Sequence, residues 1–341
     1  MFNILDLTLD ELILIFETQY QKGKYHANAT YREIFRNGNC ELRKVKEFQE
    51  SAELAILLEN DIDLNSNKVK QVFKENETEK FIFTDGDNQE YETVVVPMKS
   101  YKTLCISSQI GCKMGCTFCE TGKMGFIRDL SVKEIIEQVY YAKVIKGLNI
   151  KNIVFMGMGE PLDNFNNLIK SINILTEPKG LNFSPNQITV STVGIIKNIE
   201  KFANQKSKIN LAISLNASND IIRSEIMPIN KNNSLTQLRY TLENYPLKHK
   251  GIFFIEYVLI SGINDSIENA EELSEYLKDL PVKVNLIPYN KSKDSIYDSP
   301  SDETINSFFK VLQKNNIFAR KRISKGRDIQ AGCGQLNTVS N

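Results

Sequence analysis

The sequence predicts an α/β protein whose core is a run of six strand–helix units. From about residue 100, short apolar segments of strand length alternate with amphipathic segments of helical length. The apolar segments read KTLCISS, NIVFMGMG, QITVSTVG, INLAISLN, GIFFIEYVLISG and KVNLIPYN. Strands joined by crossover helices pair in parallel, as an open doubly wound sheet or as an incomplete barrel. Either arrangement places ligands at the carboxyl ends of the strands.

The residues before this core predict a small helical domain. In LTLDELILIFETQY the apolar residues recur at helical spacing, Thr8 suits the N-cap, and Glu11 completes a capping box. Two further helices are expected, one around Tyr31–Phe35 that ends near Gly38 and one over residues 41–60. The domain also has basic residues that could contact phosphate, although such charges equally suit a solvated helix face: Lys22, Lys24, Arg32 and Arg36.

Two β-rich runs around Asp85 and Gly86 predict a β-hairpin or meander between the helices and the core. We therefore expect four regions along the chain. They are a helical N-terminal accessory domain (1–67), a β-meander extension (68–98), the strand–helix core (99–320) and a C-terminal tail (321–341).

Composition and charge are those of an ordinary globular protein. The 341 residues are 41% hydrophobic and 25% charged, and 42 Lys and Arg balance 42 Asp and Glu. This balance argues against a polybasic protein but not against RNA binding through a local patch. No apolar run is long enough to span a membrane, and Asp6, Asp10 and Glu11 interrupt the first apolar stretch, unlike an export signal. We therefore expect a cytoplasmic protein, in which clustered cysteines indicate metal or redox chemistry.

Three cysteines follow the first core strand at a spacing that suits a metal centre. Cys112, Cys116 and Cys119 share a short loop and can converge on one side of it. Three thiolates suit a soft metal or an iron–sulfur cluster, and they leave one iron of a four-iron cluster open to a small molecule. A structural zinc site would need a fourth ligand, either Cys105 or Cys333. Chance spacing of buried cysteines is the third interpretation.

The cysteine spacing resembles the CxxxCxxC signature of the radical S-adenosylmethionine (SAM) superfamily. Six segments then occur in the order typical of the RlmN/Cfr family of RNA adenine methyltransferases, which the chain resembles over roughly residues 90–336. They read SSQIGCKMGCTFCETGKMGF, FMGMGEPLDN, VSTVGI, LAISLNASNDIIRSEIMPIN, NLIPYN and DIQAGCGQL. A weaker likeness, GKYHANATYREIFRNG, lies in the helical domain and implies that this domain binds RNA. The resemblance implies a partial (βα)6 radical SAM barrel with a [4Fe-4S] cluster and SAM as cofactors.

The resemblance also assigns residues to these cofactors. Cys112, Cys116 and Cys119 match the cluster ligands. Gly159 and Glu160, in GMGEPL, match the position that holds the amino group of SAM, since glycine allows close backbone approach and a carboxylate accepts hydrogen bonds from an ammonium. Taken alone, GMG equally suits an ordinary strand-to-helix turn. The other positions that match SAM contacts are Ser191, Ser214, Leu215, Asn216 and Asn290.

A two-stage reaction at two further cysteines is implied in the same way. Cys333, in AGCGQ, matches a methyl-carrying cysteine that takes a methyl group from one SAM. A radical from a second SAM removes hydrogen from that methyl group, which then adds to an adenine ring carbon. Glu92 matches the proton acceptor, and attack by Cys105 releases the RNA and leaves a transient Cys105–Cys333 disulfide. Without the resemblance, Glu92 would be an ordinary exposed strand carboxylate and Cys105 a buried thiol. The glycine-flanked tail around Cys333 suits a mobile exposed thiol better than a buried one.

The implied partners are RNA and an electron donor. The implied substrate is an adenine of 23S rRNA, with tRNA as a second candidate, and the wording GEPL favours ring carbon C2 over C8. Flavodoxin or ferredoxin would supply the electron, and we expect a monomer without membrane contact. Five cations shortly before Cys333 are the best candidates for phosphate contact: Arg320, Lys321, Arg322, Lys325 and Arg327.

Three positions depart from the family pattern. Asn216 stands where histidine is usual, Glu120 where a small residue is usual, and Gly332 where alanine is common. Two alternatives therefore stay open: a radical SAM enzyme with another substrate, and a metal-stabilised RNA-binding protein without catalytic activity.

Overall fold

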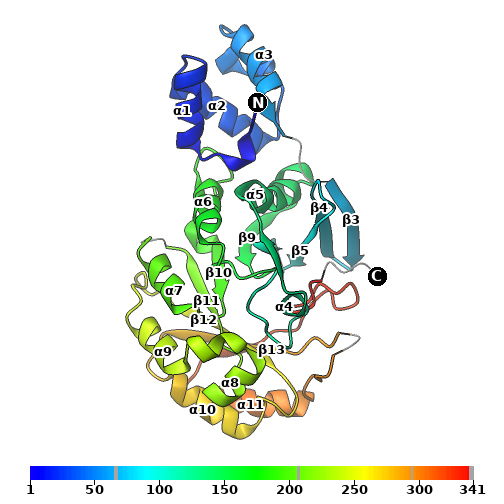
Figure 1. The fold of residues 1–341 in the computed structure, drawn as a ribbon, viewed down its shortest axis with the longest axis vertical. Helices are drawn as coiled ribbons and strands as arrows, with labels where there is room; N and C mark the ends of the chain where they lie inside the picture. Colours follow the sequence, from blue (N-terminus) through cyan, green and yellow to red (C-terminus); the bar gives the residue numbers. More distant parts are fainter. Residues whose placement is uncertain (65–67, 206–207, 293–294, 338–341) are drawn as a thin grey trace.

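A ten-stranded sheet forms the core of the chain, and helices cover much of it (Figure 1). The computed structural model describes all residues except 65–67, 206–207, 293–294 and 338–341. The strand order is β14-β13-β12-β11-β10-β9-β6-β5-β4-β3. The strands are β3 (Lys68–Glu75), β4 (Thr78–Thr84), β5 (Glu90–Pro97), β6 (Lys102–Ile106), β9 (Ile150–Phe155), β10 (Ile188–Thr192), β11 (Asn210–Ser214), β12 (Phe253–Leu259), β13 (Val282–Pro288) and β14 (Ala319–Lys321).

The strands from β6 to β14 pair in parallel, which confirms the predicted strand–helix core. The six predicted strand–helix units begin with β6, β9, β10, β11, β12 and β13, and β14 pairs in parallel with β13 as a further strand that the sequence did not predict. This strand reads ARK and carries none of the apolar alternation that marks the other six. The connecting helices are α5 (Val132–Tyr140), α6 (Phe165–Thr176), α7 (Ile196–Ala203), α8 (Asp220–Ile226), α9 (Leu235–Glu243), α10 (Ile267–Leu277) and α11 (Asp302–Lys314).

The β-extension widens the sheet on the β6 side. Strands β3, β4 and β5 are antiparallel to one another, and β5 is antiparallel to β6. The expected turn at Asp85 is present, because its carboxylate accepts hydrogen bonds from the amides of Asp87 (2.9 Å) and Gln89 (2.8 Å). Two cross-strand pairs set the register that matters for the site: Lys80 lies opposite Val94, and Val94 lies opposite Cys105.

The N-terminal residues form the expected helical region, with two differences from the prediction. Helix α1 (Leu9–Gln19) begins at the predicted capping box of Thr8 and Glu11. The second helix starts earlier than expected, as α2 (Lys24–Arg32), and continues through a π-helical turn to Gly38. The third predicted helix is wrong in its first half, where two short 3-10 turns precede α3 (Ala52–Asp61).

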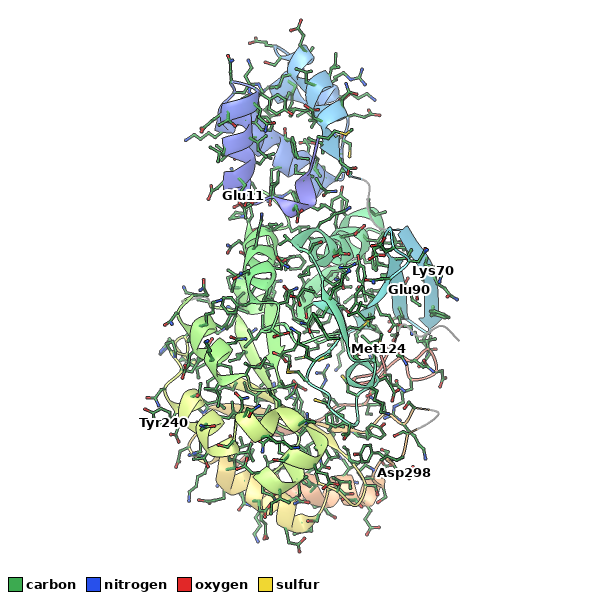
Figure 2. The ribbon with its side chains drawn as sticks, in the orientation of Figure 1. Glu11, Lys70, Glu90, Met124, Tyr240 and Asp298 are labelled. Atoms are coloured by element: carbon green, nitrogen blue, oxygen red, sulfur yellow. The ribbon has the colours of Figure 1, made fainter. Side chains whose placement is uncertain are left out.

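These helices pack on the core through α5 and α6, as Figure 1 shows. Glu11, at the junction in Figure 2, pairs with Lys170 of α6 at 2.8 Å. Asp6 accepts a hydrogen bond from the amide of Lys133 at 2.9 Å. The predicted boundary between the helical region and the β-extension falls at residues 65–67, outside the described residues.

Candidate active site

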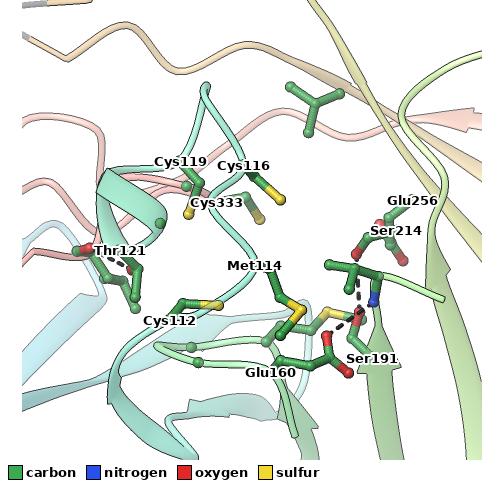
Figure 3. A pocket seen from close by; sticks show the side chains of 18 of the residues that line it. Cys112, Met114, Cys116, Cys119, Thr121, Glu160, Ser191, Ser214, Glu256 and Cys333 are labelled. Carbon is green, nitrogen blue, oxygen red and sulfur yellow. Dashed lines mark hydrogen bonds between the residues drawn. The ribbon is translucent and has the colours of Figure 1, made fainter. Parts of the chain in front are cut away.

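A cavity opens at the carboxyl ends of the parallel strands, where this fold class places ligands (Figure 3). It contains about 950 Å³ of space, open solvent included. Figure 3 shows Cys333 beside Cys116 and Cys119, with Ser214 and Glu256 across the cavity. The predicted site residues that line it are Cys112, Cys116, Cys119, Gly159, Glu160, Ser191, Ser214, Asn216 and Cys333.

The cysteine loop joins β7 (Gln109–Gly111) to the short helix α4 (Glu120–Lys123). Gly111 has a φ of +71°, and a Cβ there would lie 1.9 Å from the carbonyl oxygen of Gly125. Only glycine therefore allows the chain to enter the loop at this angle. The loop then carries Cys112, Cys116 and Cys119 along one wall of the cavity.

The three thiols have the chemistry of a cluster site. Burial raises the pKa of Cys112 to about 12 and also raises the pKa values of Cys116 and Cys119, and the neighbouring thiols add to the rise at Cys116. A metal centre reverses this balance, because it stabilises thiolates directly. Within the described residues, no three His, Cys, Asp or Glu side chains are already spaced around one metal ion. A four-iron cluster does not need that spacing, because each of the three thiolates would bind a different iron.

Glu160 forms the floor of the cavity together with Gly159. A Cβ at Gly159, whose φ is +95°, would lie 2.5 Å from the Cβ of Gln109. The Glu160 carboxylate accepts hydrogen bonds from the amides of Val193 (3.0 Å) and Leu162 (3.3 Å). Burial nevertheless raises the pKa of Glu160 to about 7. An ammonium group in the cavity would supply the countercharge that this carboxylate lacks.

The side wall combines two hydroxyl groups with an amide. The Oγ atoms of Ser191 and Ser214 lie 3.3 Å apart. Asn216 has a φ of +58°, a conformation that asparagine tolerates better than most residues. Its Oδ1 accepts from the amide of Val258 at 2.9 Å, and its Nδ2 contacts the sulfur of Met227 at 3.4 Å. The departure at Asn216 is thus compatible with the fold, because its amide is satisfied by the protein itself.

Two predicted SAM contacts lie behind the cavity wall. Leu215 is fully buried, and its carbonyl accepts a hydrogen bond from Nε of Arg223 at 3.0 Å. Asn290 donates from Nδ2 to the carbonyl of Cys333 at 3.0 Å and so holds the C-terminal tail. In the described part of the chain neither residue lines the cavity.

Arg223, to which the sequence assigned no role, connects the loops of this wall. Its side chain is fully buried in α8. Beyond Leu215, it donates to the carbonyl of Val193 at 2.5 Å and to Oδ1 of Asn230 at 2.9 Å. The sequence shows an arginine in IIRSEI but not that it is buried, because an arginine on a helix usually faces solvent. Only the structure reveals its role.

Glu256 is a second residue that the sequence did not single out. It lies in the middle of β12, lines the cavity and is 6% exposed. Its Oε1 accepts from Asn285 at 2.7 Å. Its Oε2 accepts no hydrogen bond from the residues that the structure describes and lies 3.7 Å from Nη1 of Arg322. The sequence could have identified Glu256, because it is a charged residue within the apolar run FFIEYVL and such residues are rarely buried without a partner.

The C-terminal tail runs along the helix that follows the cysteine loop. The carbonyl of Gly334 accepts from the amide of Glu120 at 2.8 Å, and the carbonyl of Leu336 accepts from Oγ1 of Thr121 at 2.7 Å. These contacts, with that from Asn290, place Cys333 on the cavity wall.

The other two departures from the family pattern also lie at this contact. The Glu120 carboxylate accepts hydrogen bonds from Ser292 at 2.6 Å and Lys123 at 2.8 Å. A Cβ at Gly332 would lie 2.6 Å from Oε1 of Gln335 and 2.9 Å from Nδ2 of Asn290. Both departures therefore fit the way in which this tail packs.

Cys333 also lines a second cavity, of about 600 Å³ with open solvent included. The residue is accessible from the two cavities, as the sequence suggested. The protein atoms packed around its sulfur nevertheless raise the pKa of Cys333, and Arg322 in the second cavity acts against that rise. Burial likewise raises the pKa of Cys105, on β6, to about 12, and Cys333 lies close enough to add to the rise. The two cysteines predicted to pair therefore lie within electrostatic range of each other.

Glu92 lies outside the main cavity, on β5 of the extension. It is 1% exposed and pairs with Lys80 of β4, with 3.1 Å between Nζ and Oε1. Burial raises the pKa of Glu92 to about 7, although Lys80 opposes this rise. The sequence-only interpretation of an exposed strand carboxylate is wrong.

Four of the five cations near Cys333 contact other described residues, and Arg320 does so with its guanidinium 5.5 Å from the centroid of the Phe318 ring. Lys321 donates to Oδ1 of Asn306, Arg322 faces Glu256, and Lys325 donates to the carbonyl of Pro97 at 2.6 Å. Arg320 and Arg327 have exposed side chains.

The basic residues of the N-terminal helices divide in a similar way. Arg32 pairs with Glu33 and Glu47, and Arg36 donates to the carbonyl of Pro178 at 2.6 Å. Contact of these residues with RNA remains a prediction.

The fold and the cysteine-lined cavity together are those of a radical SAM protein, and comparisons with known proteins agree. The sequence profile described as "Radical SAM superfamily" matches residues 106–277. The crystal structure of a radical SAM methyltransferase from Sphaerobacter thermophilus superposes with a TM-score of 0.90 at 35% identity, over 98% of this chain and 99% of that one.

Curated relatives narrow the class. A probable dual-specificity RNA methyltransferase RlmN 1 from Protochlamydia amoebophila is 38% identical, covering 99% of this chain and 94% of the relative. A dual-specificity RNA methyltransferase RlmN from Lawsonia intracellularis is 40% identical, covering 99% and 97%. The chain therefore belongs to the RlmN family of radical SAM RNA methyltransferases. As in that family, its cofactors are a [4Fe-4S] cluster and SAM. None of the helices in the described ranges is long and apolar enough to cross a membrane.

Proposed function

We propose that this enzyme methylates ring carbon C2 of an adenine in 23S rRNA, and also in tRNA, through a methyl group carried on Cys333. The position of Cys333 carries the proposal, because this residue lines both the cavity of the cluster cysteines and the second cavity. A methyl carrier needs access both to the methyl donor and to the RNA base, and Cys333 has one cavity for each. An electron-poor ring carbon cannot attack a sulfonium directly, so a carrier that is activated afterwards is required.

Each step of the proposed methyl transfer would use particular residues of the chain. Cys333 accepts the methyl group as a thiolate, with Arg322 favouring the charged form. The cluster and SAM, when bound, supply the one-electron chemistry that activates this methyl group. Glu92 would accept the proton lost from the ring carbon, and the unpaired electron of the adduct would return to the one-electron centre that began the reaction. The Cys105 thiolate then attacks the Cys333 sulfur: the S–S bond forms, and the S–C bond breaks with its electron pair left on the methylene carbon. That carbon takes up a proton to become the methyl group of the released RNA.

The ligands of the cluster would be Cys112, Cys116 and Cys119, with Glu160 facing the amino group of SAM. Ser191 and Ser214 would contact its remaining polar groups. Leu215 and Asn290 would act from behind the wall, through the positions of Arg223 and the tail.

The second cavity would receive the target nucleotide. Its lining combines two cations, Arg322 and Lys325, with the apolar side chains of Val96, Met98 and Ile323. Such a mixture suits a base with its phosphate. The N-terminal helices and the exposed Arg320 and Arg327 would hold the flanking RNA. The working enzyme would be a cytoplasmic monomer, in which flavodoxin or ferredoxin supplies electrons and the disulfide is reduced between turnovers.

The test is anaerobic turnover with deuteromethyl-labelled SAM, a 23S rRNA fragment and tRNA. We expect 2-methyladenosine in both RNAs, labelled S-methylcysteine at Cys333, and no product from Cys333→Ala. Cys105→Ala should instead accumulate a protein–RNA crosslink. Methylation that survives Cys333→Ala would reject the carrier mechanism, and 8-methyladenosine would reject the assignment to C2. SAM cleavage without any RNA product would favour another substrate.

A further inference from the structure

A buried ion pair lies beside the tail, outside the cavity that binds the cofactors. Lys80 and Glu92 have side chains that are 6% and 1% exposed, and their charged atoms lie 3.1 Å apart. Burying such a pair costs desolvation energy that its attraction often fails to recover, so stability alone does not explain it.

The strand register places this pair on the same face of the sheet as Cys105. Lys80 lies opposite Val94, which lies opposite Cys105, and directly opposed residues point to one face. Glu92 precedes Val94 by two positions on β5 and therefore shares that face. Lys80 and Glu92 are diagonal neighbours in this row, and Cys105 follows them on the next strand.

The C-terminal tail contacts the pair on both sides of Cys333. Lys80 donates from Nζ to the carbonyl of Gln330 at 3.5 Å. A backbone hydrogen bond from Asn337 reaches the Glu92 carboxylate. The ion pair thus touches the residues that precede and follow the methyl-carrying cysteine.

We propose that Lys80 is a positioning residue for Glu92, which it keeps ionised and fixed next to the tail so that the carboxylate can take the proton from the target base. The proposal rests on the proposed function. In this step the C–H bond of the ring breaks, its electron pair stays on the ring, and the proton passes to the carboxylate. Glu90 is the other charged group that acts on Glu92, and it works against ionisation. Lys80 is therefore the cation on which the charged form depends.

The test separates proton transfer from the steps before it. In Lys80→Met we expect normal S-methylation of Cys333 and normal SAM cleavage, together with accumulation of the Cys333–RNA crosslink. Release of methylated RNA should fall by at least about tenfold, since general-base catalysis commonly contributes more than that. Lys80→Arg, which keeps the cation, should release product within a few-fold of wild type and accumulate no crosslink.

The matched control is Lys74→Met. Lys74 of β3 pairs with Glu79 of β4 in the same sheet, with 3.4 Å between the charged atoms, but its side chain is 59% exposed and its partner is not a charge that acts on Glu92. All three readouts should be unchanged in this variant. If Lys80→Met fails to fold, Lys80→Gln, which keeps a hydrogen-bond donor, replaces it. In that variant S-methylation and SAM cleavage should again be normal, while product release falls and the crosslink accumulates.

Two results would overturn the proposal. One is a parallel fall in S-methylation, SAM cleavage and product release in Lys80→Met or Lys80→Gln, which would show that Lys80 only holds the tail. The other is unchanged product release. A wild-type enzyme that never carries a methyl group on Cys333 would instead reject the proposed function itself.

Discussion

Replacing Arg223 with lysine tests how the cofactor wall is held together. The guanidinium donates to the carbonyls of Leu215 at 3.0 Å and Val193 at 2.5 Å and to the Asn230 side chain at 2.9 Å. Two longer contacts reach the carbonyls of Ser214 at 3.5 Å and Asn233 at 3.4 Å. Lysine keeps the charge, but its compact ammonium has three donors and cannot span this set.

The expected loss follows from the carbonyls that stay without a donor. Each buried polar group left unsatisfied costs about 1–3 kcal/mol, so two of them give roughly 2–6 kcal/mol in the free energy of unfolding. Urea unfolding of the ligand-free chain measures this quantity. SAM affinity should fall as well, because Val193 and Leu215 belong to the loops that carry the cavity wall.

Arg239→Lys is the matched control. Arg239, on α9, makes comparable contacts to Glu243 and to the carbonyls of Tyr276 and Lys278, but its side chain is 28% exposed and water can replace the lost donors. We expect a loss below about 1 kcal/mol there. An equal loss in Arg223→Lys and Arg239→Lys would refute the reasoning from buried acceptors.

Three further outcomes are expected. Glu160→Gln should remove part of the pH dependence of the ligand-free chain. Because the folded pKa of Glu160 is raised from 4.5 to about 7, this group lowers stability by roughly 3 kcal/mol as the pH rises across that interval. The loss of unfolding free energy between pH 5 and 8, measured with urea, should therefore be smaller in the variant, and Glu92 should account for part of what is left. Thr121→Val removes the hydrogen bond from Thr121 to the tail at Leu336 and should lower the free energy of unfolding by about 1 kcal/mol. RNA methylation should fall while SAM cleavage persists, and equal losses of both activities would contradict this. Gly159→Ala should abolish SAM binding in calorimetry, whereas Gly147→Ala, at a positive φ with open space around it, should bind normally.

The parts of the fold that the sequence predicts are those with a local physical signal. Six parallel strands are apolar runs, and Thr8 with Glu11 is a capping box that the structure contains. The spacing of the three cysteines predicts that they lie on one side of their loop, and all three line one cavity. The edge strand β14 lacks such a signal because its residues are ARK, and the split of residues 41–60 into short turns depends on tertiary packing.

The parts of the site that escaped prediction depend on which way a charged side chain points. Glu256 and Lys80 occur within apolar strands, so the sequence shows that each needs a partner but not that Arg322 and Glu92 are those partners. Those partners are far away in sequence or lie on another strand. Asn290 illustrates the converse case, because its motif suggests a SAM contact whereas its side chain holds the backbone of the tail.

The buried charges around the two cavities share one physical property that bears on function. Glu92, Glu256 and Arg223 each lie at or below 6% exposure, and removing an ionised group from water costs several kcal/mol that paired charges recover only in part. Apolar side chains of similar volume would often give an equally stable protein. Stability therefore does not account for their burial. The proposed reaction would give them a use, because fixed charges in a dry site stabilise developing charge more strongly than water can.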